Sequence, residues 1–204
     1  MPDEVTAIFY DVGGVLLSNG WDTRSRRAVV DHCGLDWEEF EDRHQLVATD
    51  FELGKLTLDQ YLERTVFYRD REFDREVFWS AMKAQSTPIP ESLALLDELA
   101  TTGSYLLATL NNESRELNEH RIDTFGLRDR FSMFVSSCYL GLKKPEHEIF
   151  QTALDLSQQP PEQCLFIDDR PLNLECAVRA RMRTIQYLDA DQLRASLRAH
   201  GIAV

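Results

Sequence analysis

Residues 5–15 read VTAIFYDVGGV, and this short stretch decides the fold. The run from Val5 to Asp11 is almost continuously apolar and rich in strand-forming residues, which predicts a buried, parallel strand. Gly13 and Gly14 follow the terminal Asp11 closely, and glycine lets a ligand approach the main chain. Because open α/β sheets bind ligands at the carboxyl ends of their strands, we expect a functional site here.

The chain downstream of Pro88 alternates between strand-like and helical segments. We predict strands at residues 105–110, 134–136, 164–168 and 184–187, and helices around residues 93–99, 146–156 and 172–180. Such alternation is typical of right-handed crossovers between parallel strands, with helices on both faces of the sheet. The predicted fold class is therefore α/β, with a three-layer, Rossmann-like parallel sheet as its core.

The segment between the first strand and Pro88 differs from the rest, because its apolar residues recur at helical spacing among many charges. We predict helices over residues 23–32, from about residue 36, from Thr57 and over residues 74–82. Thr57 and Gln60 match the pattern of a capping box. The sequence thus predicts a helical cap domain, residues 19–87, inserted after the first strand into a core of residues 1–18 and 88–204.

Composition restricts the classes of partner. The chain has 204 residues, 43% hydrophobic and 28% charged, which suits one globular domain with a modest insertion. Its 35 acidic and 22 basic residues give a net charge of −13, so its long-range field repels nucleic-acid phosphates and anionic lipid. Its apolar runs are far shorter than the roughly 20 residues that cross a bilayer. We expect neither a nucleic acid nor a membrane as partner.

The first four residues read MPDE and place acids where a secretory signal carries positive charge. They predict a cytoplasmic protein. The oligomeric state stays open between a monomer and a homodimer.

Charged residues gather at the ends of the predicted strands: Asp11, Lys144 and the pair Asp168-Asp169. Parallel strand order brings them to one edge of the sheet. Three carboxylates at one place repel one another unless a cation compensates, and such oxygen ligands suit Mg²⁺, which shares its coordination sphere with water and substrate phosphate. Lys144 is then placed to neutralise the phosphate as a point charge.

This pattern resembles the haloacid dehalogenase (HAD) superfamily of aspartate-nucleophile phosphatases. Residues 11–15, DVGGV, are similar to its first motif, and Lys144-Pro145 is similar to its third. Asp168-Asp169, followed by Asn173, looks like the fourth motif, in which the Asn would steady the acidic loop. The likeness covers nearly the whole chain, including the placement of a helical cap.

Two further segments, residues 141–150 and 166–177, look closest to small bacterial sugar-phosphate phosphatases related to glucose-1-phosphatase. The resemblance therefore implies a Mg²⁺-dependent phosphatase that acts on a small phosphorylated metabolite, with sugar phosphates among the candidates.

The same resemblance implies a mechanism. The carboxylate of Asp11 would attack phosphorus and form an aspartyl-phosphate, which water would then hydrolyse. Mg²⁺ would be held by Asp11, the backbone carbonyl of Gly13 and Asp169, with Asp168 acting through water. Lys144 would stabilise Asp11 and the transferring phosphoryl oxygens.

Two positions depart from the family pattern. Most of its phosphatases carry a general acid and base two residues after the nucleophile, where this chain has Gly13. Such a group is typically worth about 10²- to 10⁴-fold in rate. At the second motif, Leu110 stands where a Ser or Thr would bind phosphate, and Thr109 should face the opposite side of a regular strand. Asn111, a backbone amide or a bulge that re-aims Thr109 could substitute.

These departures support an alternative, a catalytically impaired HAD-fold member that binds phosphate or a protein. Hydrolytic dehalogenation also uses an Asp nucleophile, but it ranks low because the acidic pair fits a metal site better. For the phosphatase hypothesis, we predict the catalytic set Asp11, Gly13, Asn111 and Lys144.

The remaining candidates are contacts for the substrate. They are Asn111 and Asn112 after the second motif, Trp21 and Arg24 where the chain enters the cap, and Arg115 after the polar turn. Packing is the alternative for Trp21 and Arg24, and a position on a helix surface is the alternative for Arg115.

Overall fold

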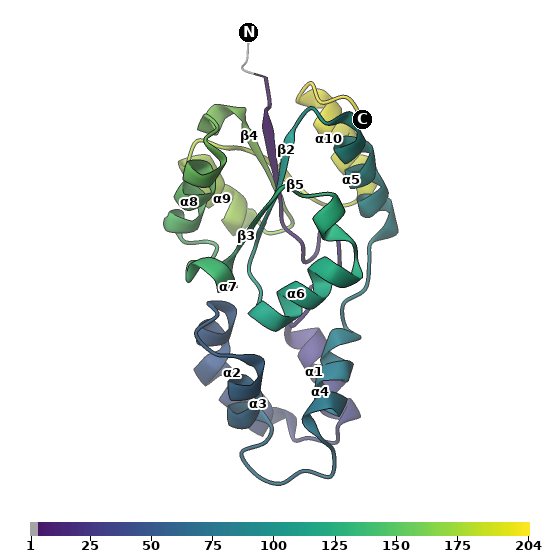
Figure 1. Cartoon of the computed structure of the whole chain (residues 1–204), viewed down its shortest axis with the longest axis vertical. Helices are drawn as coiled ribbons and strands as arrows, with labels where there is room; N and C mark the ends of the chain where they lie inside the picture. Colours follow the sequence, from purple (N-terminus) through teal and green to yellow (C-terminus); the bar gives the residue numbers. More distant parts are fainter. Residues whose placement is uncertain (1–3) are drawn as a thin grey trace.

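The core of the molecule is a parallel sheet with the strand order β3-β2-β1-β4-β5, in a computed structural model that describes residues 4–204 (Figure 1). Residues 1–3, which carry part of the argument for a cytoplasmic protein, lie outside the described residues. The strands are β1 (Ala7–Tyr10), β2 (Leu106–Asn111), β3 (Met133–Ser136), β4 (Cys164–Asp168) and β5 (Arg183–Gln186). The α/β fold class is confirmed, and each predicted strand forms within two residues of its predicted bounds.

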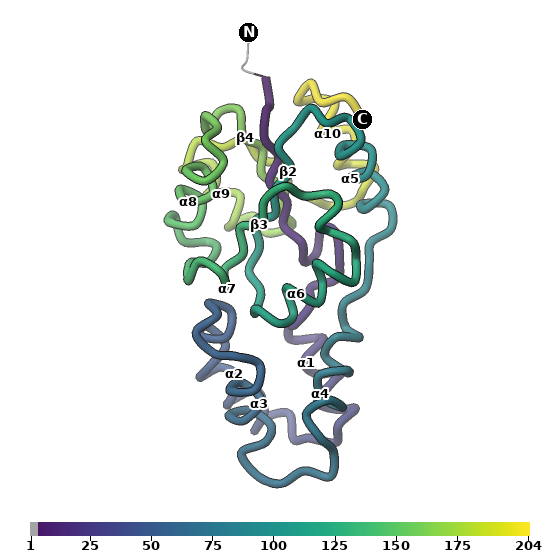
Figure 2. Tube along the Cα trace, viewed as in Figure 1, coloured from purple at the N-terminus to yellow at the C-terminus, as the bar shows by residue number. Residues whose placement is uncertain are grey.

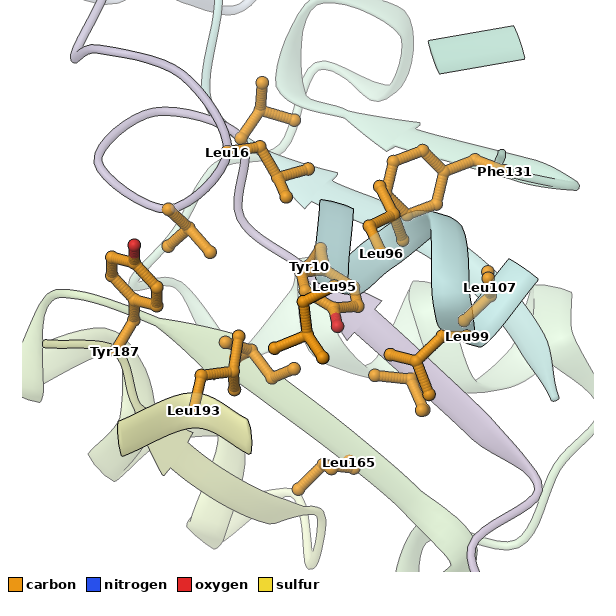
Figure 3. Close-up of a cluster of buried hydrophobic side chains, with 14 of the residues drawn as sticks. Tyr10, Leu16, Leu95, Leu96, Leu99, Leu107, Phe131, Leu165, Tyr187 and Leu193 are labelled. Carbon is orange, nitrogen blue, oxygen red and sulfur yellow. The ribbon is translucent and has the colours of Figure 1, made fainter. Parts of the chain in front are cut away.

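Alternate residues of the central strand contribute to two separate hydrophobic clusters. Ile8 and Tyr10 belong to the first, which packs against α5 (Pro90–Thr102) and α10 (Ala190–Ala199) (Figure 3). Ala7 and Phe9 belong to the second, which packs against α8 (His147–Ser157) and α9 (Pro171–Arg179). Figure 2 shows these two pairs of helices on opposite sides of the sheet, which gives the predicted three layers.

Four helices lie together beyond the carboxyl ends of the strands (Figures 1 and 2): α1 (Thr23–His32), α2 (Trp37–Glu52), α3 (Leu58–Thr65) and α4 (Arg75–Lys83). Each begins at a side chain that accepts a hydrogen bond from the first helical turn, and the predicted capping box at α3 is formed. Phe40, Tyr61 and Phe78 are central to a third hydrophobic cluster, which these helices share. The apolar faces predicted for this segment are therefore buried against one another.

The two segments that join these helices to the sheet run side by side. Ser18 N–H donates to the Thr87 carbonyl at 2.8 Å, and Thr87 N–H donates to Ser18 Oγ at 2.9 Å. This pairing lies where the sequence places both boundaries of the cap domain, and the division into two domains stays a prediction.

Helix α6 (Arg115–Thr124), which the sequence analysis does not predict, connects both parts of the molecule. Its Leu117 packs into the cluster of α1–α4, and its Ile122 packs into the first cluster of the sheet. Helix α10 and the short helix α7 (Ser137–Leu140) are likewise not predicted from the sequence. Two 3₁₀ turns, at Leu127–Asp129 and Pro161–Gln163, complete the elements.

Across residues 4–204, no helix combines the length and the apolar character needed to cross a membrane.

Candidate active site

Three carboxylates meet where β1 and β4 end. Tyr10 pairs with Ile167, so Asp11 and Asp168 leave adjacent strands at the same level, and the Asp11 N–H donates to the Ile167 carbonyl at 2.8 Å. Carboxylate oxygens of Asp11, Asp168 and Asp169 all lie within 4.8 Å of one another. The structure thus brings together the acidic residues that the sequence places at strand ends.

Lys144 lies between two of these acids. Its Nζ donates to Asp168 Oδ2 at 2.6 Å and lies 3.0 Å from Asp11 Oδ1, and its side chain is 2% exposed. Asn112 fixes the backbone here, because its Oδ1 accepts from Lys144 N–H and its Nδ2 donates to the Lys144 carbonyl, both at 2.8 Å. Asn112, predicted to contact the substrate, therefore uses its amide to position Lys144, although it also lines the cavity described below.

The two neighbouring aspartates have different surroundings. Asp168 is fully buried and accepts hydrogen bonds from Asn173 Nδ2 at 3.0 and 2.9 Å and from Arg170 N–H at 2.8 Å, in addition to Lys144. Asp169 Oδ1 is buried without a hydrogen-bond partner among the described residues. The oxygens of Asp168 therefore already accept hydrogen bonds from protein donors, whereas Oδ1 of Asp169 accepts none from the described residues.

The electrostatics of the cluster favour an additional cation. Burial raises the pKa of Asp11 to about 6; the charge of Lys144 lowers it and that of Asp168 raises it. Burial and the charge of Asp168 also raise the pKa of Asp169. Lys144 alone thus leaves this site short of positive charge, and the unpartnered oxygen of Asp169 suits a hard divalent cation.

The two glycines after Asp11 differ in what they allow. Gly14 has a φ of +77°, and a Cβ there would lie 2.6 Å from Asp169 Oδ2, so only glycine lets the acidic loop approach. Gly13 is not in the left-handed region, and a Cβ there would lie 3.4 Å from Asn19 Oδ1 and 3.8 Å from an Arg121 guanidinium nitrogen. The backbone at residue 13 therefore has room for a side chain.

Asp11 and Lys144 form the floor of a cavity of about 290 Å³ that reaches from the sheet edge to α1 and α2. Gly13, Trp21 and Asn112, which the sequence predicts as site residues, also line this cavity. Its lining further includes residues that the sequence analysis does not single out, among them Arg26, His44, Glu113, Ser114 and Arg121.

A histidine on α2 faces this cavity. His44 is 7% exposed, and its Nδ1 lies 2.9 Å from Tyr61 Oη, which also accepts a hydrogen bond from Trp21 Nε1 at 2.9 Å. Burial, together with the charge of Arg26, lowers the pKa of His44 to about 4. The imidazole is therefore neutral at neutral pH.

A buried ion pair closes the cavity next to Gly13. Arg121 donates to Glu113 Oε2 at 2.9 Å and also bonds to the Ser18 carbonyl, in the segment that leads to α1. Burial raises the pKa of Glu113, although Arg121 opposes the shift. The pair therefore ties helix α6 and the end of β2 to the loop after β1.

Three predicted substrate contacts do not line the cavity. Arg24 is exposed on α1, and Arg115 donates to the Cys138 carbonyl at 2.9 Å. Asn111 is buried, where it donates to Asn118 Oδ1 at 2.9 Å and accepts from Ser136 Oγ at 2.8 Å. The structure therefore does not bring these three residues to the cavity, and the binding roles expected for them and the catalytic role expected for Asn111 stay predictions.

The second motif lacks its hydroxyl in the structure as well. Leu110 is fully buried in the second hydrophobic cluster, and the register between β2 and β3 is continuous from Ala108 to Asn111, so no bulge re-aims Thr109. The Thr109 hydroxyl is buried without a partner among residues 4–204 and does not line the cavity. Ser114, at the start of α6, brings a hydroxyl-bearing side chain to this side of the cavity instead.

Known proteins resemble this chain in sequence. A family model described as haloacid dehalogenase-like hydrolase matches residues 5–181. Flavin mononucleotide hydrolase 1 of Arabidopsis thaliana is 29% identical over 164 residues, which cover 80% of this chain and 66% of that protein. The pyrimidine 5'-nucleotidase YjjG of Escherichia coli is 26% identical, with 75% and 72% covered, and the phosphoglycolate phosphatase of Aquifex aeolicus is 26% identical, with 65% and 59% covered. The chain thus spans about two thirds of the length of these relatives.

Solved structures share the fold. A HAD family enzyme from Bacteroides thetaiotaomicron superposes with a TM-score of 0.78 at 21% identity, covering 91% of this chain and 95% of that one. Its complex with magnesium and inorganic phosphate gives a TM-score of 0.76 at 20% identity, covering 90% and 94%. At these identities the likeness establishes the arrangement of the chain.

Proposed function

This chain belongs to the haloacid dehalogenase-like hydrolase family, and from that premise we propose that it is a Mg²⁺-dependent phosphatase of small phosphorylated metabolites. The observation that carries the proposal is the buried group at the floor of the cavity. There Asp11 and Asp168 share Lys144, and Asp169 keeps an oxygen without a partner among the described residues. This group offers a nucleophile, a fixed positive charge and ligands for a cation within one small volume.

The residues present fit Mg²⁺. We assign Asp11 and Asp169 as its ligands, because Asp169 Oδ1 has no donor among the described residues and the three carboxylates are close enough to share one ion. The carbonyl of Gly13 is the further ligand that the resemblance to the HAD family implies. Asp168 already accepts from Asn173, Lys144 and the backbone, so its contribution goes through water and through the orientation of Lys144. When bound, the ion neutralises the carboxylates and polarises a phosphoryl oxygen.

The chain's own groups carry the chemistry. Asp11 Oδ1 accepts from Val12 N–H at 2.8 Å and lies 3.0 Å from Lys144 Nζ, which leaves Oδ2 as the oxygen free to attack phosphorus. The new bond from Asp11 to phosphorus forms as the bond to the leaving oxygen breaks, and water supplies the proton to that oxygen. Water then attacks phosphorus, the bond to Asp11 breaks, and phosphate leaves. Lys144 stabilises the charge on the phosphoryl oxygens in both steps.

The relatives and the size of the cavity support a phosphate ester as substrate. The relatives are named for hydrolysing flavin mononucleotide, a pyrimidine nucleotide and phosphoglycolate, all of which carry a phosphate group. A cavity of about 290 Å³ lies at the lower end of the usual range of ligand pockets, which suits a small leaving group. Sugar phosphates, the subtype suggested by the sequence, fit this size and stay a prediction.

Phosphate release from a panel of sugar phosphates, nucleotides and simple phosphate esters tests the proposal. We expect release in Mg²⁺ and none above background in excess chelator. A folded protein that releases no phosphate from any member of the panel in Mg²⁺ would contradict the proposal. Binding of phosphate without turnover would instead support the impaired member that Gly13 and Leu110 suggest.

Restoring a carboxylate at residue 13 is expected to increase turnover. In Gly13→Asp, the added side chain has room, and it would supply the general acid and base that the cavity lacks at this point. Such groups contribute about 10²- to 10⁴-fold when ideally placed. The nearby Arg121 cation would lower the pKa of the new carboxyl, so less of it is protonated at neutral pH, and we expect about a tenfold rise in kcat on alkyl phosphates. Phenyl phosphate should gain less, because its leaving group needs less protonation.

Gly13→Asn is the matched control, since its side chain has nearly the same size and cannot transfer the proton. If folded Gly13→Asp is no faster than Gly13→Asn on alkyl phosphates, the missing acid is not what limits the rate.

A further inference from the structure

The proposed chemistry gives no role to the imidazole of His44, which is buried in the lining of the cavity. It lies on α2, in the wall opposite the strand-end carboxylates, and it shares the cavity with Asp11 and Lys144. Its ring is stacked on Phe40, with an interplanar angle of 8°, and it meets the edge of Tyr61. Packing therefore holds the ring in one orientation.

Hydrogen bonding favours one tautomer of this ring, the one in which every polar hydrogen of the group has an acceptor or faces the cavity. An indole N–H can only donate, so Trp21 Nε1 is the donor to Tyr61 Oη. The hydroxyl proton of Tyr61 is then free to be donated to His44 Nδ1, 2.9 Å away. Because Nδ1 accepts and the ring is neutral, the proton of the imidazole resides on Nε2. No group among the described residues accepts from Nε2, so this N–H is available to a ligand.

The wall of the cavity that contains His44 offers no unpaired cation among the described residues: its positive charge is paired with a carboxylate, and its other charged groups are negative. Arg26, the cation contributed by α1, donates to Glu41 at 2.8 and 3.0 Å and to the Trp21 carbonyl at 2.8 Å. Asp22 and Glu52 also line the cavity, and Glu52 forms an ion pair with Lys143 at 3.3 Å. The cation of Arg170 lies on the opposite side, beside Asp169. The wall formed by α1 and α2 therefore offers a neutral donor and carboxylate acceptors, which together suit a hydroxyl group.

We propose that His44 Nε2–H donates a hydrogen bond to a hydroxyl of the substrate's leaving group, and that the site thereby selects small, uncharged, hydroxyl-bearing phosphate esters. The carboxylate of Asp22 disfavours a leaving group that carries its own negative charge, whereas the charge of Glu52 is matched by Lys143 at 3.3 Å. This inference rests on the proposed function for its use of a phosphate ester, and it adds the class of leaving group and the residue that recognises it.

The test measures binding, so that it does not depend on turnover. Asp11→Asn serves as the background, and calorimetry in Mg²⁺ compares three ligands of equal chain length: erythritol 4-phosphate, butyl phosphate and 4-phosphoerythronate. Two variants are added to this background. His44→Phe keeps the stacked ring and removes both nitrogens, whereas His44→Gln keeps an amide N–H close to the position of Nε2.

We expect His44→Phe to weaken the binding of erythritol 4-phosphate by about tenfold, the usual worth of one hydrogen bond, and to change the binding of butyl phosphate by less than about twofold. His44→Gln should recover most of the loss. Erythritol 4-phosphate should also bind more tightly than 4-phosphoerythronate. In Asp11→Asn with His44 intact, the nitrogen NMR signals of His44 should show that Nε2 carries the proton. These signals should shift when erythritol 4-phosphate is added.

Equal losses for erythritol 4-phosphate and butyl phosphate would show that His44 acts only through the structure of the cap, and the proposal would fall. Tighter binding of 4-phosphoerythronate would overturn the preference for an uncharged group. Failure of the phosphatase proposal is recognised separately, by the absence of phosphate release from the protein with Asp11 intact.

Discussion

Replacing Asp11 with Asn is expected to reduce phosphate release by at least about 10³-fold, because the amide cannot attack phosphorus and the covalent step is lost. The replacement keeps the size of the side chain, and its oxygen can still accept from Val12 N–H, which now contacts Oδ1 at 2.8 Å. Phosphate release under saturating substrate and Mg²⁺ measures the effect. Acid quenching of the unsubstituted protein during turnover should trap one phosphoryl group per chain, and the variant should trap none.

The same variant should not lose stability in the absence of metal. Burial raises the pKa of Asp11 from 3.8 to about 6 in the folded protein, so its contribution to stability is full at low pH and is lost as the pH rises through about 6. At neutral pH the ionised, buried carboxylate therefore costs stability relative to its protonated form. Asn removes that cost, although Lys144 then loses the negative charge of Asp11 and keeps only that of Asp168 as an ion-pair partner.

Asp189→Asn is the matched control for this change. Asp189 is exposed and caps α10, where its Oδ1 accepts from Gln192 N–H at 2.8 Å, and Asn caps helices equally well. Activity should therefore be unaffected. A folded Asp11→Asn protein that keeps more than about one tenth of the activity would exclude Asp11 as the nucleophile.

The strands could be predicted because buried strands appear in the sequence as continuous runs of apolar residues. β4 was predicted with its exact bounds, since all five of its residues are buried. Helix α6 gives no comparable signal: Leu117 and Ile122 are its buried apolar residues, and they face two different clusters. A helix that bridges two cores lacks the single apolar stripe on which periodicity depends.

The site shows the same division between strand ends and helix faces. Asp11 and Asp168 could be placed together because strand order fixes where parallel strands end. Arg24 was predicted at the cavity, yet Arg26 occupies it. Arg26 lies three and four residues before the buried Val29 and Val30, so it shares their face of α1, whereas two residues along a helix turn Arg24 about 200° away. The spacing of Arg26 from Val29 and Val30 could therefore have predicted that Arg26, and not Arg24, lies on the buried face of this helix.

The sequence could not predict that three further residues, His44, Glu113 and Arg121, line the cavity. Glu113 lies in a loop, and Arg121 reaches it from the second turn of an unpredicted helix, so their contact depends on where α6 docks. His44 does share a stripe with Phe40, Val47 and Phe51, which indicates burial and nothing about a cavity. Tertiary packing, which a single sequence does not encode locally, decides these positions.

Replacing Lys144 with Met is expected to lower both activity and stability. Removing a charge that stabilises the transferring phosphoryl group typically costs about 10²- to 10³-fold in kcat. Lys144 and Asp168 are 2% and 0% exposed, and removing one partner of such a buried pair typically costs about 3 to 5 kcal/mol of the free energy of unfolding. Phosphate release and urea unfolding in chelator measure the two losses.

Mg²⁺ should offset part of this stability loss. Without Lys144, the carboxylates of Asp11, Asp168 and Asp169 lack their fixed positive charge, so a bound cation gains more from them and binds the folded state more tightly. The increase in Tm caused by Mg²⁺ should therefore be larger in Lys144→Met than in the unsubstituted protein. Lys143→Met is the control, because Lys143 makes a longer, partly exposed pair with Glu52, worth at most about 1 kcal/mol, and a hydrogen bond to Thr49 Oγ1, both at 3.3 Å. Equal increases in Tm in both variants would show that the cation does not bind at this acidic cluster, and the assignment of Asp11 and Asp169 as its ligands would then be wrong.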